Sequence, residues 1–504
     1  MSRQQRLTLV ATILGSTVVF LDSTVVNVAL PAIADGLDAD LAGQQWVVES
    51  YMLTLVSLLL VGGSLGDQFG RRRMFVFGLI AFGVCSALCA VAPSVEFLVA
   101  MRALQGIAGA LLVPGSLAIV AATFEGAARG RAVGTWTAWT GIATVIGPAG
   151  GGALVGLTSW RAIFWINIPL IAATVALTLH SVRESRDPDA FRGIDWLGIG
   201  LSAAGLGGPV FALIEQPDRG WGDPAVWIPF VVGIACFALF VLHEVRARHP
   251  MLDLGLFRIR NFAVTNLTTF ATYAGLIGGL FFVGLFLQQV AGYSPLEAGL
   301  ATTPVSLILF FLSPRWGKLA SGTGPRLPMT VGPIVGGFGL LLLLRVGSGA
   351  DYVVDVLPGI LVFGLGLSAT VAPLTATVLD SVEERHVGIA SGVNNAVARV
   401  AGLLAIAVLG AVISARFAAL APDVLGGPLT AHAASASTSA FHLGLLIAGI
   451  LMIVGGIVSA LGIENPRRTT RAVPSRGSAQ AGECGHGADA DCASPERTPV
   501  VEPA

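Results

Sequence analysis

Long apolar stretches, separated by short polar segments, run through most of the chain. A helix needs about 20 mostly apolar residues to cross a bilayer, and fourteen stretches meet that requirement. They lie near residues 7–30, 46–66, 74–92, 97–121, 131–156, 161–180, 194–213, 225–243, 261–290, 296–316, 328–346, 355–379, 388–415 and 439–463. The pattern therefore predicts an all-α polytopic membrane protein with fourteen transmembrane helices.

The composition agrees with a membrane protein and excludes several other classes. Hydrophobic residues make up 54% of the chain and charged residues only 12%, whereas a soluble domain carries about 25% charged residues. A net charge of −1 excludes a basic nucleic-acid-binding protein. Five cysteines are too few for a disulfide framework. Cys484, His486 and Cys492 do not supply the four closely spaced ligands of a zinc site, so we predict no metal.

The placement of arginine predicts the orientation in the membrane. Alternate loops are rich in arginine, beginning with residues 71–73 and then Arg129 and Arg131, whereas the intervening loops carry mostly acids such as Asp38 and Asp40. Three arginines break this pattern: Arg161, Arg219 and Arg416. The positive-inside rule places the arginine-rich loops and both termini in the cytoplasm. We therefore expect a multi-pass protein of the cell (plasma or inner) membrane.

A weak internal repeat suggests how the spans are grouped. The string GSLGDQFGRR at 63–72 follows the second span, and GKLASGTGPR at 317–326 follows the tenth. If spans nine to fourteen repeat spans one to six, spans seven and eight are an inserted pair, and internal repeats of this kind are common in transporters. We expect a six-helix bundle at 1–180, an inserted helix pair with cytoplasmic linkers at 181–256, a second six-helix bundle at 257–463 and a disordered cytoplasmic tail at 464–504.

Motifs for enzymatic or ATP-driven work are missing from the sequence. There is no phosphate-binding loop of the G-x-x-x-x-G-K-[ST] kind. There is also no H-E-x-x-H pair and no nucleophile elbow. We therefore expect a protein that is not an enzyme and holds no cofactor. Any energy that it uses should come from an ion gradient.

Three charged residues lie inside the first four apolar spans. At about 1.5 Å per helical residue, Asp22 lies ~14 Å, Arg102 ~8 Å and Glu49 ~5 Å below the predicted outer ends of their spans. An isolated charge there is costly, so Asp22 should pair with another group or take up a proton. Arg102 keeps its own proton and can serve as the fixed counter-charge. Glu49 either shares this network or is a residue of the outer rim.

Two further strings are rich in glycine. GSLGDQFGRRR at 63–73 combines glycines, one acid and three arginines in a short loop. The fifth span contains ATVIGPAGGG at 143–152, and proline with several glycines in one helix predicts either a packing groove or a hinge. On residues alone, the loop arginines could be purely topogenic.

Together these strings resemble the major facilitator superfamily, and in particular its fourteen-span drug:proton antiporter branch. The loop at 63–73 is similar to the signature loop after the second span, and LVAMRALQGIAG at 98–109 is similar to the proton-coupling motif. The string at 143–152 is similar to the antiporter motif, and LDSTVVNVALP at 21–31 and WRAIFWINIP at 160–169 also match the branch. The motifs cover the first 180 residues well, whereas the remainder matches mainly in span count and spacing.

The resemblance implies a major facilitator fold and roles for particular residues. Asp22, Arg102 and Glu49 are the expected proton-coupling residues. The loop expected to lock the two bundles contains Gly63, Asp67, Gly70, Arg71, Arg72 and Arg73. The helix bend expected to limit proton leak contains Gly147, Pro148, Gly151 and Gly152.

The expected function is proton-coupled efflux of small, largely apolar organic compounds, such as drugs or antibiotics, by alternating access. The alternatives are a dedicated exporter of one metabolite or lipid, and proton-coupled uptake, which the fifth-span motif disfavours. The expected partners are the substrate, protons and the lipid bilayer. Candidates for the substrate cavity are Asn27, Gln105, Trp139, Tyr273, Asn394 and Asn395, although helix packing is the better explanation for any one of them. Because spans nine, ten, eleven and thirteen carry no acid in mid-membrane, we do not expect dicationic substrates.

Overall fold

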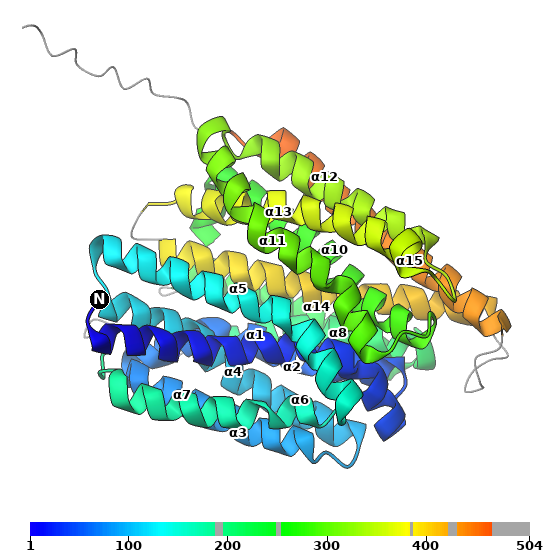
Figure 1. Ribbon diagram of the computed structural model, residues 1–504, viewed down its shortest axis with the longest axis horizontal. Helices are drawn as coiled ribbons and strands as arrows, with labels where there is room; N and C mark the ends of the chain where they lie inside the picture. The colour runs from blue at the N-terminus through cyan, green and yellow to red at the C-terminus, as the bar shows by residue number, and fades with distance from the viewer. Residues whose placement is uncertain (187–194, 248–253, 384–386, 422–430, 466–504) are drawn as a thin grey trace, which may run out of the picture. The chain divides into compact units, whose positions relative to one another are not determined.

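The computed structural model of the protein describes residues 1–186, 195–247, 254–383, 387–421 and 431–465, and these ranges contain helices and no β-strand (Figure 1). The α-helices are α1 (Arg3–Leu37), α2 (Leu41–Phe69), α3 (Arg71–Ala90), α4 (Val95–Thr123), α5 (Gly126–Leu157), α6 (Ala162–Trp165), α7 (Asn167–Ser181), α8 (Trp196–Arg219), α9 (Pro224–Arg246), α10 (Arg260–Gln289), α11 (Pro295–Thr323), α12 (Arg326–Leu342), α13 (Leu357–Asp380), α14 (Val387–Leu420) and α15 (Ala431–Gly462).

The number of membrane-length helices is consistent with the prediction. Within the described residues, twelve helical units, with α6 and α7 taken as one, are long and apolar enough to cross a membrane. The helix α2 meets the same test as a bent pair of segments. The 32-residue α5 contains a shorter apolar segment at Ile146–Leu157. With α2 and α5 added, each predicted span has a helix in the structure.

The helices extend beyond the predicted apolar spans because polar residues cap them. The Asp40 side chain accepts a hydrogen bond of 2.7 Å from the backbone N–H of Gly43 at the start of α2. Ser294 and Glu297 form a reciprocal capping box at the start of α11. Such caps satisfy N–H groups that the first helical turn leaves unpaired. The helix therefore begins at the capping residue and not where the apolar run begins.

Contacts between helices divide the described chain into two groups and a pair. In the first helix group, α1–α7, α1 packs on α4, α5 and α7, and α2 packs on α4. In the second helix group, α10–α15, α10 packs on α14 and α15, and α12 packs on α13 and α15 (Figure 1). The inserted pair, α8 and α9, pack on each other, and α8 also contacts α2 and α14.

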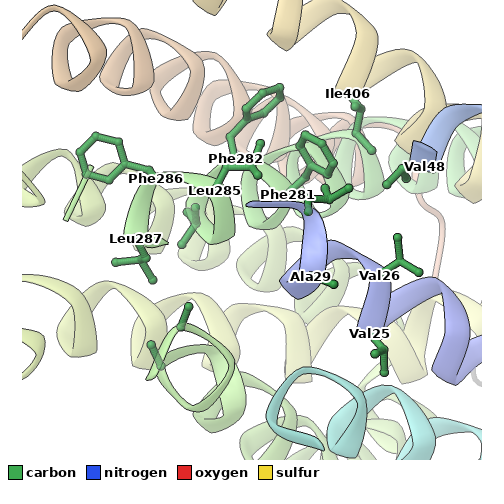
Figure 2. Packing of buried hydrophobic residues seen from close by; sticks show 14 of the residues in the cluster. Val25, Val26, Ala29, Val48, Phe281, Phe282, Leu285, Phe286, Leu287 and Ile406 are labelled. Atoms are coloured by element: carbon green, nitrogen blue, oxygen red, sulfur yellow. The ribbon is translucent and has the colours of Figure 1, made fainter. Parts of the chain in front are cut away.

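An apolar core joins the two helix groups. Val26 and Ala29 of α1 and Val48 of α2 belong to the same buried cluster as Phe281 of α10 and Ile406 of α14 (Figure 2). Removal of apolar surface from water is the main favourable term when such side chains pack together. The cluster therefore holds the first and second helix groups together in this state.

Polar contacts lie beside this core, at the end of the molecule where α1, α5 and α10 finish. The Gln45 side chain donates a hydrogen bond of 2.9 Å to the carbonyl oxygen of Ile406. Gln289 donates one of 3.1 Å to the side-chain oxygen of Gln44. Both bonds join α2 to the second helix group, so the two groups are closed against each other at this end.

Candidate functional site: a buried ion pair and its surroundings

Asp22 of α1 and Arg102 of α4 form an ion pair inside the first helix group. The Arg102 guanidinium donates to Asp22 Oδ2 at 2.5 Å, and each side chain is only 1% exposed. The structure therefore brings together two of the three residues that the sequence singled out as charges within apolar spans. A pair so fully removed from water needs further hydrogen bonds to be tolerated.

Two amide side chains complete the hydrogen bonding of Asp22. Gln105 donates to Asp22 Oδ1 at 3.1 Å, and Asn167 of α7 donates to the same oxygen at 3.0 Å. Asn167 also lies 3.0 Å from the Ser86 hydroxyl of α3. Gln105 was expected in the substrate cavity, but it is completely buried in this network and also accepts a bond of 2.8 Å from Arg102. We call these residues, Asp22, Arg102, Gln105, Asn167 and Ser86, the Asp22 network.

Arg102 is held on its other side by α2. Its Nε donates to the carbonyl oxygen of Val47 at 3.1 Å, and the Tyr51 ring lies 4.2 Å from the guanidinium carbon. This approach of α4 to α2 depends on Gly106, where a methyl group would overlap the backbone carbonyl of Tyr51. Both Nε and Nη1 of Arg102 therefore have hydrogen-bond partners, which fix the orientation of the guanidinium group.

Sequence reasoning did not assign a role to Asn167, Ser86 or Tyr51. Asn167 lies within WINIP, one of the strings that resembled the drug:proton antiporter branch, and an amide in an apolar span was the available signal. Ser86 and Tyr51 gave no such signal, because single hydroxyl groups are common in transmembrane helices.

Glu49 is buried but does not join the Asp22 network. It is fully buried on α2, and neither of its carboxylate oxygens has a hydrogen-bond partner. The alternative that Glu49 is an exposed rim residue is therefore wrong for this state. The helix geometry explains the error, because α8 and α14 both pack on α2 and cover residues near its start. Its role in proton coupling stays a prediction.

The turn between α2 and α3 is built around Gly70 and an acid from another segment. Gly70 has a φ of +111°, which favours glycine. Glu184, just after α7, accepts bonds of 3.0 and 3.2 Å from the backbone N–H groups of Arg72 and Arg73. Asp67 pairs with Arg71 at 2.7 Å. Both members of that pair thus lie in this turn, and a lock between the two bundles stays a prediction.

The second copy of this loop has the same construction. Gly324 has a φ of +91°, and Asn465, just after α15, accepts a bond of 3.1 Å from the backbone N–H of Arg326. Gly324 and Arg326 align with Gly70 and Arg72 in the internal repeat. Asn465 therefore stands where the first copy has Glu184. The shared caps support the repeat that the sequence only suggested.

The glycines of α5 lie where helices touch. A side chain at Gly147 or Gly151 would collide with Thr24 or Val25 of α1, and one at Gly152 would lie 2.9 Å from the Leu296 Cα of α11. The packing interpretation of this string therefore has direct support. Gly63 of α2 is less crowded, because a methyl group there would lie 3.6 Å from Pro114 of α4. The bend at Pro148 and its effect on proton leak stay predictions.

The remaining candidates for the substrate cavity differ in how far they are buried. Trp139 is 55% exposed, and Asn395 is also exposed. Asn27 and Tyr273 are partly buried. Asn394 hydrogen-bonds to Asn266 and Thr269 of α10 at 3.2 and 2.7 Å, so it joins α14 to α10 in this state.

No metal site is apparent within the described ranges, where no group of three or more His, Cys, Asp or Glu side chains is placed to hold an ion. Cys484, His486 and Cys492 lie outside the described residues.

A family model described as the Major Facilitator Superfamily matches residues 12–406. The chain belongs to this superfamily. It is therefore a multi-pass membrane transporter and not an enzyme.

Its relatives in the superfamily include resistance and efflux proteins. The chain is 37% identical to the multidrug resistance protein Stp of Mycobacterium tuberculosis, over 82% of this chain and 77% of the relative. It is 35% identical to the tetracenomycin C resistance and export protein of Streptomyces glaucescens, also over 82% and 77%. It is 33% identical to the multidrug efflux pump LfrA of Mycolicibacterium smegmatis, over 83% and 84%.

Solved structures agree on the fold of this transporter. A bacterial homologue of the human lysosomal transporter Spinster, in an inward-facing and unoccupied conformation, matches with a TM-score of 0.63 and 16% identity. The match covers 92% of this chain and 97% of the other. The helix contacts and this likeness confirm the predicted major facilitator fold.

Proposed function

We propose that this transporter exports small, largely apolar organic compounds, such as drugs or antibiotics, across the cell membrane in exchange for protons. The observation that carries the proposal is the completely buried Asp22–Arg102 pair. The names of the relatives support the export of drugs and antibiotics. Exchange for protons rests on the chemistry of the pair.

Asp22 can carry a proton because its charge is stable only while its partners are in place. A charged side chain in mid-membrane costs about 2.5–3.5 kcal/mol on insertion scales, and Arg102 with the two amides offsets that cost here. When the helices rearrange and Arg102 moves away, the lone carboxylate takes up a proton. When the pair forms again, Asp22 releases the proton. One cycle then moves one proton through this site, and Glu49 is the second candidate carrier.

We further propose how the two helix bundles move during transport. The bundles at 1–180 and 257–463 rock about a central cavity, with the pair at 181–256 inserted between them in sequence. The loop with Asp67 locks the bundles when the cavity faces outward, and the helix bend at Pro148 limits proton leak. Both termini, including the tail at 464–504, lie in the cytoplasm.

Transport in proteoliposomes with an imposed acid-inside pH gradient tests the proposal, with tetracenomycin C as the first probe. Some transporter molecules insert with their cytoplasmic face towards the outside of the liposome. We expect these molecules to take up the probe into the liposome at the expense of the pH gradient. Asp22→Asn and Arg102→Ala should each abolish this uptake, because the first removes the proton-binding group and the second leaves its charge unpaired. Asp35→Asn, which changes an exposed acid of the same helix, should transport normally.

Several outcomes would contradict the proposal. Full gradient-driven transport by Asp22→Asn would place the proton carrier elsewhere, and Glu49→Gln would be the next variant. Uptake supported by ATP with the gradient dissipated would refute proton coupling. Transport of a wider panel of apolar drugs should then be measured. Transport of many of them indicates broad efflux, and transport of one indicates a dedicated exporter.

A further inference from the structure

Arg399 is a second arginine buried in the membrane-spanning part of the protein. It lies near the middle of the 34-residue α14, and only 9% of the residue is exposed. Its guanidinium carbon is 5.6 Å from the centre of the Phe20 ring of α1. The side chain therefore reaches from the second helix group towards the first.

Among the described residues, Arg399 differs from Arg102 because it has no hydrogen-bond or ion-pair partner. Arg102 has a carboxylate, an amide and a backbone carbonyl within hydrogen-bond distance. Among the residues that the structure describes, Arg399 makes no hydrogen bond and no ion pair, and its guanidinium group lies over the Phe20 ring. A guanidinium group has five N–H donors and keeps its charge in proteins. Such a group is rarely buried without an anion.

Among the described residues, no acid forms an ion pair with Arg399 in the observed state. In the described part of the second helix group the acids lie at or near helix ends, as Glu297 does in the first turn of α11 and Asp380 at the end of α13. Asp22 is already bonded to Arg102. Glu49 is buried on α2, which packs on α14, but its oxygens have no partner. The described residues therefore leave Arg399 without an anion, and a bound compound can supply one.

The surroundings of Arg399 suit an apolar molecule with one acidic group. Asn395 lies one helical turn before Arg399, on the same face of α14, and is exposed. Phe20 offers an aromatic surface beside the guanidinium. Asn27 lies about two turns along the same face of α1 from Phe20, and its buried Oδ1 has no hydrogen-bond partner. A few polar groups on an apolar background are typical of small-molecule sites.

We propose that Arg399 binds the anionic group of an exported compound, with the apolar body of the compound against Phe20 and with Asn395 as a further hydrogen-bond donor. The ligand class is a small apolar organic acid. Charge-assisted bonds from a guanidinium to a carboxylate are among the strong hydrogen bonds of proteins. The inference rests on the proposed export function and specifies one substrate class for it.

Binding of two matched probes to the purified full-length transporter tests the site. The probes are 1-naphthaleneacetic acid, which is ionised at neutral pH, and the neutral 1-naphthaleneacetamide, measured by calorimetry. We expect the acid to bind about ten- to a hundredfold more tightly than the amide. Arg399→Gln should abolish that preference with little change for the amide, and Arg399→Lys should keep most of it. Arg416→Gln, which changes an exposed arginine of the same helix, should keep all of it.

Three results would overturn the assignment: equal affinities in the unaltered protein, a preference that survives Arg399→Gln, or equal loss of both probes in Arg399→Gln. A fourth is that Glu49→Gln reproduces the effect of Arg399→Gln on both probes, which would make Glu49 the partner of Arg399 in another state. The binding needs no proton gradient. If the probes show no preference that depends on Arg399 while tetracenomycin C is still transported on a gradient, the site is refuted and the proposed function stands. If the preference is found but gradient-driven transport is not, the proposed function is refuted and the site stands.

Discussion

At the scale of single residues, the Asp22 network shows how a carboxyl group is accommodated inside a membrane protein. Asp22 accepts bonds from Arg102 and Gln105 of α4 and from Asn167 of α7. Three donors from two helices therefore meet at one carboxylate. Because the donors belong to separate helices, a small shift of α7 or α4 changes how well the charge is held.

Asn167→Ala tests this dependence. The variant loses the bonds to Asp22 and to Ser86, each worth about 1 kcal/mol, and we expect both lower stability and at least a threefold fall in protons moved per substrate transported. Ser116→Ala is the control, because it removes a buried bond of 2.7 Å between α4 and Ser16 that lies outside the Asp22 network. It should lower stability alone. An unchanged proton-to-substrate ratio in Asn167→Ala would show that Asn167 only packs α7 against α3.

The sequence identified the ion pair but not its full environment. Asp22 and Arg102 stand out because a charge within an apolar span is costly whatever surrounds it. Asn167 and Ser86 matter only because α3 and α7 bring them to Asp22, and no local pattern contains that information. The bond between Gln105 and Asp22 could not be predicted either, because the sequence places Gln105 on α4 but does not show which side chain of another helix it meets.

At the scale of elements, the turn between α2 and α3 combines two kinds of contact. Glu184 accepts bonds from the first N–H groups of α3, whereas Asp67 pairs with Arg71 at the partly exposed end of the turn. The first contact satisfies backbone groups that have no other partner. The second joins two side chains that are 31% and 18% exposed, and exposed pairs contribute only about 0–1 kcal/mol.

The two contacts should therefore respond differently to substitution. Glu184→Ala should lower the free energy of unfolding by about 1 kcal/mol, as loss of a helix cap does. Asp67→Asn should leave stability nearly unchanged but reduce transport severalfold, because its proposed role is in the conformational cycle. Labelling of the buried thiols of Cys85 and Cys89 in α3 during heating reports unfolding, and Arg183→Ala is the control. Normal transport by Asp67→Asn at equal protein level would refute the lock.

Helix positions could be predicted because hydrophobicity alone decides which segments enter a bilayer. Helix ends could not, since caps such as Asp40 and Ser294 lie in the polar segments between spans. The repeat of the α2–α3 turn was visible only faintly. The strongest evidence for the repeat is that Glu184 and Asn465 accept hydrogen bonds from the backbone N–H groups of Arg72 and Arg326. The residues of each bond are more than a hundred positions apart in the sequence.

At the scale of the whole molecule, the two helix groups are closed against each other at one end. There Gly152 of α5 packs on Leu296 of α11, and Gly299 of α11 packs on the backbone of Pro148. Glycine at these positions lets the helices touch without a side chain between them. The contact therefore stabilises the state in which this end is shut.

Gly152→Ala should weaken that state. Overpacking of this kind costs about 1–3 kcal/mol, so the population in which α5 and α11 have separated should rise at least severalfold. Spin labels at Leu157 and Leu300, both exposed, would report this as longer distances in a background without native cysteines. Gly156→Ala is the matched control, since its Cβ would meet open space. Identical distance distributions for the two variants would refute a gating role for the contact.

The position of α8 makes the two flanks of the transporter unequal. On one flank α5 and α11 meet directly, whereas on the other α2 and α14 meet and α8 also contacts both of them. Behind α8 lies α9, whose exposed side chains include Val231, Phe237 and Leu242. A hydrophobic compound that has partitioned into the surrounding lipid therefore meets a wall two helices deep on the second flank. On the first flank it meets the packed pair of α5 and α11, with no such second layer among the described helices.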